Sequence, residues 1–478
     1  MASPFIYRFT RDLRLEDHAG LARAASFGDV LPVLVIDRVL ESRIARSPRR
    51  AAFFCAAVAA LDIALRERGA QLIVRRGAPG AVLKNIARAC GAQGVAWCAN
   101  YDSVSAHSDE RLQSELEEAG LRAAIVHDAL AIAPEETAAA RPSGGGNGYR
   151  AFAPYFASWQ ELGVASYDAP LLVRFASSEL HSEPLPAPHD FGAFDRPVEA
   201  GPASAQRVLD QFLEGPGVHY ALAINAPSED RTSHLSAHLS FGTISPRWVV
   251  NRTRKRLEDP FLLSEERFSL RLFLRSLALR DFFLQLGFFH PNADDEPLQE
   301  RMRKFPFART HQALDAWRGG RTGFAFVDAG IRQLHETGWM HPRARTVAAS
   351  FLCFDLGVDW RVGRDEWAQW LIEDDPAIAN GNWQWIAGVG ADMAQYPRIY
   401  NPHKAGRRFD PNGVYVRRWV PELAQAGSWS WSARAPQAQL ALPFLNVESA
   451  YPRAVVDHEA AARAFLERYR TFTASGGR

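Results

Sequence analysis

The chain has 478 residues, more than one compact domain usually holds, so we expect two or three domains. Its 55 Lys and Arg residues nearly balance its 54 Asp and Glu residues, and the net charge of +1 excludes a basic field over the whole surface. Any nucleic-acid contact must therefore use a local patch. The four cysteines form no CxxC pair, which argues against a zinc ribbon or an iron–sulfur cluster, and so few thiols in so long a chain argue against a disulfide framework.

The sequence lacks apolar runs long enough for a membrane. No stretch reaches 18 apolar residues, and the first 30 residues carry charges instead of a secretory signal. We therefore expect a soluble cytoplasmic protein without a membrane partner, and we expect a monomer. Nine of the 13 Trp residues follow residue 317, which predicts a large aromatic core, a relay of redox-active rings or a stacking surface.

The first third of the chain alternates short apolar runs with amphipathic stretches. This alternation predicts a doubly wound α/β domain over residues 1–130, with a parallel sheet covered by helices on both faces. The expected strands are residues 4–7, 31–36, 71–74, 94–98 and 123–126, and the expected helices are residues 50–68, 80–89 and 108–119.

The composition changes after residue 130. Residues 143–148 consist of Ser, Gly and Asn, and residues 171–203 are rich in Pro without a helical period, so we expect a long connector over residues 131–204. From residue 205 to 478, apolar residues recur every three or four positions, which predicts an all-helical domain. The clearest expected helices are residues 264–286, 310–317, 324–336 and 343–356.

Three polar segments of the helical half are candidates for binding. Thr232 and Ser233 precede a helical stretch, where hydroxyls serve as N-caps or where a helix start binds a phosphate. Asn380–Trp385 places two Trp residues two positions apart, which directs them to different neighbours. The stretch Arg398–Arg408 reads as a short basic loop, usually a solvated face and sometimes a phosphate site.

Each signal is weak alone, but their order along the chain is specific. The chain resembles the photolyase/cryptochrome family from about residue 4 to about residue 425, nearly its whole length. The matching motifs are Phe9–Leu15, Thr232–Ser236, Thr322–Gly330, Gly338–His341, Asp359–Arg361, Asn380–Trp385, Arg398–Pro402 and Trp419–Leu423. So many matches in the right order make a chance resemblance negligible.

The resemblance implies a non-covalent FAD in the helical domain, and the cofactor carries the photochemistry. By match of motif, the residues that would hold its diphosphate and ribityl chain are Tyr220, Thr232, Ser233, Leu235 and Ser236. Arg280 would lie beside the phosphates. Arg345 would pair with Glu373 next to the isoalloxazine, and Asp375 would contact the ring edge or the ribityl hydroxyls.

The resemblance also implies a relay of three Trp residues from the flavin to the surface. Trp383 matches the first position and Trp360 the second, but the third position is Phe307. Phenylalanine is much harder to oxidise than tryptophan, so Phe307 should not relay a hole. Either another Trp or Tyr takes that role, or photoreduction is slow.

The implied lesion pocket departs from both repair templates of the family. The acidic residue of dimer-repairing enzymes is Ser276, the Trp three residues later is Leu279, and the Asn that faces flavin N5 is Ala379. The two His residues of the (6-4) repair branch fall on Pro342 and Thr346. A serine is shorter than a carboxylate and uncharged, and an alanine makes no side-chain hydrogen bond.

DNA is the partner that the resemblance implies. Trp385, a stacking ring of the pocket, is retained, and the expected DNA contacts are Arg343, Arg398, Lys404 and Arg407. A folate or deazaflavin antenna and an empty antenna cleft both stay open, because residues 101–109 are mostly small and neutral. His234 and His238 lie four apart without a third ligand at metal spacing, so we expect no metal.

Two functions therefore compete. The first is a blue-light-driven, FAD-dependent photolyase, a carbon–carbon lyase that acts on pyrimidine lesions flipped out of DNA, with weak activity or an unusual lesion. The alternative is a cryptochrome-like blue-light receptor without repair activity, whose signalling partner the sequence does not identify. A flavoprotein that has lost both activities is the third possibility. The scaffold, the flavin motifs and the basic residues place the photolyase first.

Overall fold

The computed structural model describes residues 3–141, 146–165, 173–194, 198–392, 397–425, 431 and 451–475. The chain forms two compact units. The sheet unit comprises Met1–His219, Ser233–Asp294 and Ile372–Ile378, and the helical unit comprises Tyr220–Thr232, Asp295–Leu371 and Ala379–Arg478. These units interleave along the chain, whereas the predicted domains are continuous stretches, so the boundaries at residues 130 and 204 stay predictions.

A five-stranded parallel sheet forms the centre of the sheet unit. The strands are β1 (Phe5–Phe9), β2 (Val30–Ile36), β3 (Ile73–Arg76), β4 (Gly94–Cys98) and β5 (Arg122–Val126). Their order is β3-β2-β1-β4-β5, so the winding direction reverses between β1 and β4. The apolar runs of β1, β2 and β4 are buried along their whole length, as expected for a parallel sheet covered on both faces. All five predicted strands are confirmed.

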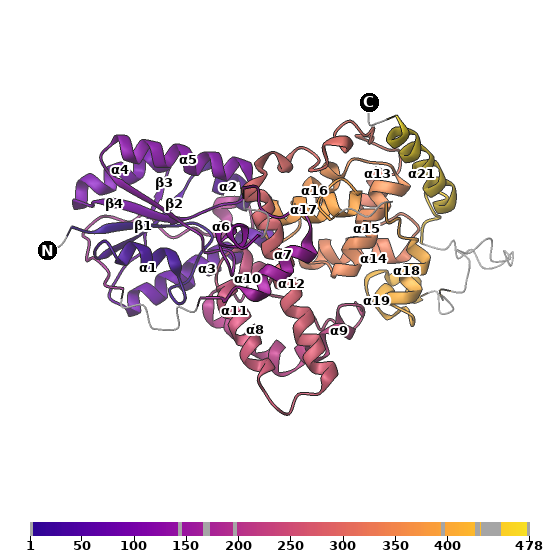
Figure 1. Ribbon diagram of the computed structural model, residues 1–478, viewed down its shortest axis with the longest axis horizontal. Helices are drawn as coiled ribbons and strands as arrows, with labels where there is room; N and C mark the ends of the chain where they lie inside the picture. Colours follow the sequence, from indigo (N-terminus) through magenta and orange to yellow (C-terminus); the bar gives the residue numbers. More distant parts are fainter. Residues whose placement is uncertain are drawn as a thin grey trace. The chain divides into compact units, whose positions relative to one another are not determined.

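Helices cover both faces of this sheet (Figure 1). On one face, α4 (Pro79–Cys90) and α5 (Ser103–Glu118) pack Leu83 and Leu112 against Ile6 and Trp97. On the other face lie α1 (Ala19–Ala25) and α3 (Pro48–Glu67), whose side chains share a core with Tyr7. The doubly wound arrangement predicted from the alternating pattern is therefore confirmed.

The sheet unit also contains further helices, most of them from later parts of the chain. They are α2 (Arg38–Ala45), α6 (Pro134–Ala139), α7 (Phe152–Glu161), α8 (Pro202–Glu214), α10 (Ser236–Ser240), α11 (Pro246–Leu257) and α12 (Ser264–Phe289). Helices α6 and α7 lie inside the predicted connector, and with six and ten residues they are too short to show a clear helical period. Residues 143–145 of the predicted glycine-rich loop lie outside the described residues.

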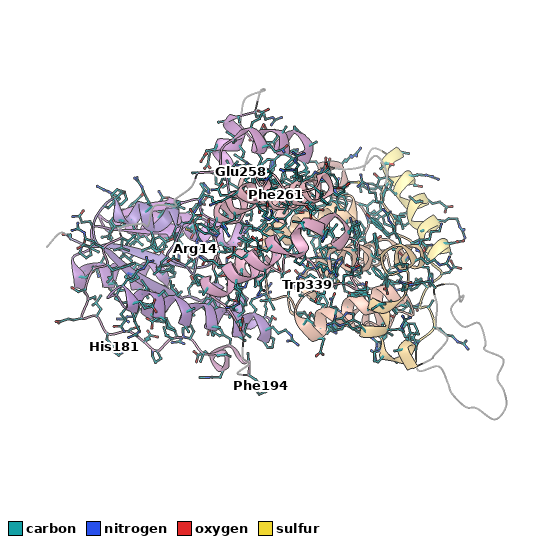
Figure 2. The ribbon with its side chains drawn as sticks, turned by 90° about the horizontal axis from the view of Figure 1, so that it is seen from below. Arg14, His181, Phe194, Glu258, Phe261 and Trp339 are labelled. Carbon is teal, nitrogen blue, oxygen red and sulfur yellow. The ribbon has the colours of Figure 1, made fainter. Side chains whose placement is uncertain are left out.

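A buried ion cluster connects distant segments of the sheet unit. Asp128, just after β5, accepts from Arg14 Nη2 at 2.6 Å and from Arg247 Nη2 at 2.7 Å. Arg14, labelled in Figure 2, follows β1, and Arg247 lies in the first turn of α11. All three side chains are nearly inaccessible to water, so each charge depends on the others for compensation.

Within the residues that the structure describes, the helical unit contains helices and no β-strand. They are α9 (Tyr220–Ala223), α13 (Leu314–Arg318), α14 (Ala325–Thr337), α15 (Pro342–Ser350), α16 (Trp360–Trp367), most of α17 (Pro376–Ala387), α18 (Pro402–Phe409), α19 (Val414–Trp419), α20 (Pro421–Gln425) and α21 (His458–Ala474). The predicted helix 343–356 divides into α15 and a π-helical turn at Phe351–Asp355. The fold class, an α/β sheet domain with an all-helical second part, is confirmed. Across the described ranges, every helix is too short or too polar to cross a bilayer.

Candidate functional site

The hydroxyl-rich segment before α10 does not cap a helix. Helix α10 begins at Ser236 with Leu235 as its N-cap, and no side chain caps it. His234 just before it has a positive φ of 50°, an uncommon backbone conformation for a residue other than glycine. The interpretation of Thr232 and Ser233 as N-caps is therefore wrong, because the left-handed turn at His234 separates them from the helix.

Thr232 carries the clearest sign of a missing ligand in this segment. Its Oγ1 atom is buried, and no hydrogen-bond partner for it lies among the residues that the structure describes. A buried hydroxyl without a partner is costly, so native structures normally satisfy it with protein, water or a ligand. A hydroxyl donor at this position suits a phosphate oxygen, which is the contact that the motif predicted.

Two further residues that were predicted to bind the cofactor are positioned by contacts within their own units. Tyr220 opens α9 in the helical unit and is buried. Arg280 on α12 donates through Nη2 to the carbonyl oxygen of Leu239 at 3.2 Å and through Nη1 to that of Ala129. These two backbone contacts fix the guanidinium within the sheet unit. Its place beside a phosphate stays a prediction.

The acidic run Glu373–Asp375 belongs to the sheet unit and meets a set of arginines there. Asp374, which the sequence did not single out, accepts from Arg43 Nε at 2.6 Å and lies 3.5 Å from Arg50 Nη1. Burial alone would raise the pKa of Asp374, but these two guanidinium groups outweigh burial and lower the pKa far below its usual range. Asp374 is therefore a structural anchor of the segment.

The neighbours of Asp374 carry the predicted cofactor contacts. The carboxylate of Asp375 pairs with Arg11 Nη1 at 3.1 Å, and Arg11 comes from the predicted N-terminal motif. The carbonyl oxygen of Glu373 accepts from Arg50 at 3.3 Å. In the helical unit, Arg345 donates through Nε to the carbonyl oxygen of Met340 at 2.8 Å. The predicted pair between Arg345 and Glu373 stays a prediction.

The two Trp residues of α17 have different neighbours, as their spacing predicted. The ring of Trp383 is buried and lies 4.5 Å from the ring of Trp367 on α16, between centroids. Trp385 is half-buried, and the exposed guanidinium of Arg398 lies 5.4 Å from its ring centroid. Trp385 and Arg398 were predicted separately as lesion and DNA contacts, and the structure brings them together. Ala379 lies one turn before Trp383 on the same helix.

The second and third positions of the predicted relay have other neighbours, and the relay itself stays a prediction. Trp360 is fully buried, and the guanidinium groups of Arg361 and Arg364 each lie 5.3 Å from its ring centroid. Over the described part of the chain, no ring pair joins Trp360 to Trp383. Phe307 packs 4.7 Å from Phe305 in an apolar cluster. Trp367, which the sequence treated only as one of many aromatic residues, is the ring that contacts Trp383.

The hydroxyls that replace lesion-pocket residues bond to their own helices. Ser276 donates to the carbonyl oxygen of Leu272 at 3.1 Å, one turn back on α12. Thr346 likewise donates to the carbonyl oxygen of Pro342 at 3.0 Å on α15. In each of these bonds the hydroxyl donates to the carbonyl oxygen four residues earlier, so its proton is not available to a nucleobase. Leu279 is apolar, so these three positions offer little direct recognition to a base.

The predicted basic loop is a helix, and this prediction was wrong. Asn401 caps α18 by accepting from the backbone N–H of Lys404 at 2.9 Å, and Pro402 occupies the first turn. The exposed residues of α18 are His403, Lys404, Arg407 and Arg408, and its buried residues are Pro402, Ala405, Gly406 and Phe409. One whole face is therefore basic. Arg407 also donates to the carbonyl oxygen of Trp431 at 2.6 Å.

Arg343, a predicted DNA contact, has a structural role in the helical unit. Its Nε donates to Asn225 Oδ1 at 2.8 Å, and its guanidinium lies 5.4 Å from the ring centroid of Phe409 on α18. The side chain is half-buried, and burial lowers its pKa. A role at DNA stays a prediction for this residue.

The expected antenna cleft lies where the winding of the sheet reverses, the usual ligand position in doubly wound folds. Its lining is charged and internally paired. Arg8 meets Asp37 at 3.1 Å, and Arg43 meets Asp102 at 3.0 Å. Asp109 accepts from the indole N–H of Trp97 at 3.0 Å. The sequence missed these pairs, and the question of a folate or deazaflavin antenna stays open.

His238, one of the two histidines discussed as metal ligands, has another partner. His238 Nδ1 lies 2.8 Å from Thr243 Oγ1, and burial lowers its pKa to about 4. A different buried group, Asp12, His18 and Cys98, has metal-like spacing. There, however, the Asp12 carboxylate accepts from the Tyr7 hydroxyl, and His18 Nδ1 accepts from the N–H of Leu21 at 3.3 Å. These hydrogen bonds account for the cluster without an ion.

Comparison with known proteins gives matches over nearly the whole chain. A family model described as DNA photolyase matches residues 5–176, and one described as the FAD binding domain of DNA photolyase matches residues 273–471. The deoxyribodipyrimidine photo-lyase of Streptomyces griseus is 38% identical over 472 residues, which cover 97% of this chain and 98% of that protein. Cryptochrome-1 of Arabidopsis thaliana is 32% identical over 95% of this chain and 68% of that protein.

Solved structures agree with these sequence matches. A bacterial class III photolyase from Agrobacterium tumefaciens aligns with a TM-score of 0.84 and 29% identity, over 99% of this chain and 98% of that one. An archaeal photolyase from Sulfolobus tokodaii, described with two FAD molecules, aligns with a TM-score of 0.81 and 26% identity over 98% of this chain and all of its own. Photolyases and cryptochromes thus both lie among the similar proteins.

Proposed function

The chain belongs to the photolyase/cryptochrome family and has its FAD-binding domain, and from this premise we propose that it repairs pyrimidine lesions in DNA with light. The observation that carries the proposal is the basic face of α18, where every exposed side chain is Lys, Arg or His. A receptor that never meets DNA has no evident need for such a face. The reaction class is that of a carbon–carbon lyase acting on DNA.

FAD is the cofactor, and we propose its contacts residue by residue. Bound FAD supplies an electron to the lesion when light excites its reduced form. The unpartnered Oγ1 of Thr232 suits a phosphate oxygen, and Tyr220, Ser233, Leu235, Ser236 and Arg280 complete the proposed diphosphate and ribityl contacts. Arg345, Glu373 and Asp375 are proposed for the isoalloxazine. Trp383 is the proposed first electron donor to the photoexcited flavin.

Recognition of DNA is assigned to the helical unit. Lys404, Arg407 and Arg408 contact the phosphate backbone, which positions the duplex without reading its sequence. Trp385 stacks on an extruded base, and Arg398, already over that ring, adds a cation next to the phosphates. Arg343 supports α18 through Phe409.

The altered pocket residues determine how strong the activity is. Ser276 and Thr346 bond back to their own helices, and Leu279 and Ala379 are apolar, so a lesion gains fewer hydrogen bonds than in other repair enzymes. We therefore expect weak repair, or repair of a lesion that Trp385 recognises mainly by stacking. The same four residues favour the second candidate, a blue-light receptor without repair activity.

A repair assay separates these two functions. Purified protein with fully reduced FAD is illuminated on single-stranded DNA that contains cyclobutane dimers, with a dark control, and the loss of dimers is measured. We expect light-dependent loss. Trp385→Ala should weaken binding of the lesion strand by about 1–3 kcal/mol, because a stacking ring is removed. Unchanged dimers in the light, together with normal flavin photoreduction, would support the receptor instead.

A further inference from the structure

Asp375 is held by an arginine that comes from a distant part of the sheet unit. Its Oδ1 atom lies 3.1 Å from Nη1 of Arg11, and Asp375 makes no other ion pair among the residues that the structure describes. The exposed fractions of the Asp375 and Arg11 side chains are 10% and 13%, so the pair is largely shielded from water. Asp374, by contrast, has Arg43 and Arg50 as partners of its own. The charge of Asp375 therefore depends on Arg11.

The backbone around Arg11 is fixed on two sides. Arg11 follows β1 at the carboxyl end of the sheet, where the winding direction reverses. Oδ1 of Asp12 accepts from the N–H of Thr10 at 2.7 Å, which closes the turn that contains Arg11. The chain after α10 packs against this turn at Gly242, where a Cβ atom would lie only 2.4 Å from the carbonyl oxygen of Arg11. The guanidinium therefore extends from a main chain whose position is well defined.

The guanidinium of Arg11 contacts two neighbouring residues of the acidic segment. Its Nη1 donates to the carbonyl oxygen of Asp374 as well as to the carboxylate of Asp375, and its Nη2 lies 3.5 Å from Oδ1 of Asn100. Contacts to both the backbone and the side chain fix the direction in which the Asp375 carboxylate points. Because Asp375 immediately precedes α17, the same contacts also hold the start of that helix.

A small polar cavity lies beside the pair. Its volume is about 20 Å³, and its lining includes Arg11, Asp375, Asn100 and Ser240. This volume holds about one water molecule, so little solvent is available to screen the two charges. A poorly screened charge acts on nearby groups more strongly than it would in water. Arg11 therefore influences a ligand next to Asp375 without touching it.

We propose that Arg11 is a positioning residue for the flavin, which directs the Asp375 carboxylate toward the isoalloxazine and offsets its negative charge there. The inference rests on the proposed contact between Asp375 and bound FAD. Reduction makes the isoalloxazine more negative, so an unpaired carboxylate beside it would oppose reduction. The positive charge of Arg11 removes this opposition and favours the reduced form that the proposed repair needs.

The reduction potential of bound FAD, titrated with a reductant in the dark, tests the effect of charge. Arg11→Gln removes the charge but keeps hydrogen-bond donors, and we expect its potential to shift to a more negative value. Arg11→Lys keeps the charge and should restore most of the wild-type potential. Arg8→Gln is the matched control, because Arg8 lies in β1 three residues earlier and pairs with Asp37, also at 3.1 Å. No shift in Arg11→Gln, or an equal shift in Arg8→Gln, would overturn the proposal.

A double-mutant cycle tests whether Arg11 acts through Asp375. FAD affinity is measured by titrating flavin-free protein and following the flavin fluorescence. Arg11→Gln and Asp375→Asn should each weaken binding severalfold, and the double variant should bind about as well as Asp375→Asn alone, because Arg11 then has no carboxylate to position. Losses that multiply in the double variant would contradict the proposal.

Failure of the proposed function has a different signature. A wild-type protein that takes up no FAD would remove the premise, whereas normal FAD uptake with unchanged affinity and potential in Arg11→Gln would refute only the role of Arg11. If Arg11→Gln does not fold, as judged by circular dichroism, Arg11→Lys provides the test. A lysine keeps the charge but lacks the rigid fork of the guanidinium, so FAD should bind severalfold more weakly. Wild-type affinity in Arg11→Lys would then contradict the positioning role.

Discussion

The side chain of Ala379 is a single methyl group, one turn before Trp383 on α17. The family resemblance places an asparagine there, with its amide toward flavin N5. Ala379→Asn should restore that hydrogen bond, and one such bond contributes about 0.5–1.5 kcal/mol. We therefore expect the photoreduced flavin of the variant to return to its oxidised form in air several times more slowly, as followed by recovery of the blue absorption band.

Ala379→Val is the matched control for this change. It adds bulk at the same position without a donor, so its recovery rate should stay near that of the wild type. Equal rates in the Asn and Val variants, both with full FAD content, would show that residue 379 does not face N5.

Ordered motifs in the sequence name individual residues such as Trp383, Trp385 and Thr232, whose roles stay predictions. Contacts between distant segments have no such signal. Asp374 was missed because its partners Arg43 and Arg50 are more than 300 residues away, and no local pattern encodes such a charge cluster. The contacts of Trp367 with Trp383 and Trp317 were missed for the same reason, because folding brings these rings together from separate helices.

At the scale of elements, α15 depends on a histidine that must stay neutral. His341 Nδ1 accepts the N–H of Arg343 at 3.2 Å as the N-cap of α15, and burial lowers the pKa of His341 to about 4. Protonation would remove this acceptor. The contribution of His341 to stability is complete above its unfolded pKa of about 6.5 and is lost as pH falls through about 4, which amounts to at most about 3 kcal/mol.

His341→Asn should remove this part of the acid sensitivity, because the amide oxygen of Asn also caps a helix but does not titrate in this range. We expect the free energy of unfolding of the variant to fall less between pH 7 and pH 5 than that of the wild type, measured with urea at each pH. His107→Asn, at an exposed position, is the control and should keep the wild-type slope. Parallel slopes in both variants would show that His341 is not the sensitive group.

Helix α18 makes a separate prediction about DNA. Lys404→Ala combined with Arg408→Ala removes two exposed cations of its basic face while leaving the buried side intact. If each cation neutralises one phosphate, the slope of log affinity against log salt should fall by about 2 for duplex DNA. Titration of fluorescent DNA at several salt concentrations measures this slope.

The control for α18 removes the same number of charges elsewhere. Lys84→Ala with Arg88→Ala changes two cations on α4 of the sheet unit and should leave the slope unchanged. A slope that falls equally in both double variants would show that net charge, and not the face of α18, determines DNA affinity.

Helices and strands could be predicted from the sequence where a single pattern of apolar residues was clear. All five strands were found, because buried parallel strands are continuous apolar runs between turns. Helix α18 was predicted to be a loop because its four exposed residues are all polar and basic, which hid the apolar spacing of the buried positions Ala405 and Phe409. The N-cap at Asn401 followed by Pro402 was the signal that could have revealed it.

At the scale of the whole molecule, the ion cluster at Asp128 holds the sheet unit together. Burial alone would raise the pKa of Asp128, but Arg14 and Arg247 lower it far below its usual range. Asp128→Asn leaves two buried guanidinium groups without their counter-charge, which should destabilise the unit by about 3–5 kcal/mol. Chemical unfolding followed by circular dichroism measures this loss.

An exposed ion pair provides the comparison. Asp210 meets Arg252 at 2.7 Å, but both side chains are open to solvent. Asp210→Asn should therefore cost less than about 1 kcal/mol. Similar losses in the two variants would show that the Asp128 cluster contributes no more than a surface pair.

The sequence predicted the fold class of the whole molecule, whereas the domain boundaries at residues 130 and 204 stay predictions. Alternation of strands and helices in the first third, followed by helical periods, was sufficient for the class. The sheet unit nevertheless includes Ser233–Asp294 and Ile372–Ile378. Their membership depends on tertiary contacts such as those of Asp374 and Arg247, which leave no trace in local periodicity.

The central claim is that light moves an electron from an indole of the helical unit to bound flavin, and one measurement tests it most directly. Purified wild type and Trp383→Phe, both containing FAD, are illuminated with blue light in the presence of a thiol while the flavin band is recorded. The account predicts rapid bleaching of the wild type and a persistent band in Trp383→Phe. Equally rapid bleaching of both proteins, or a wild-type protein that binds no flavin, would contradict it.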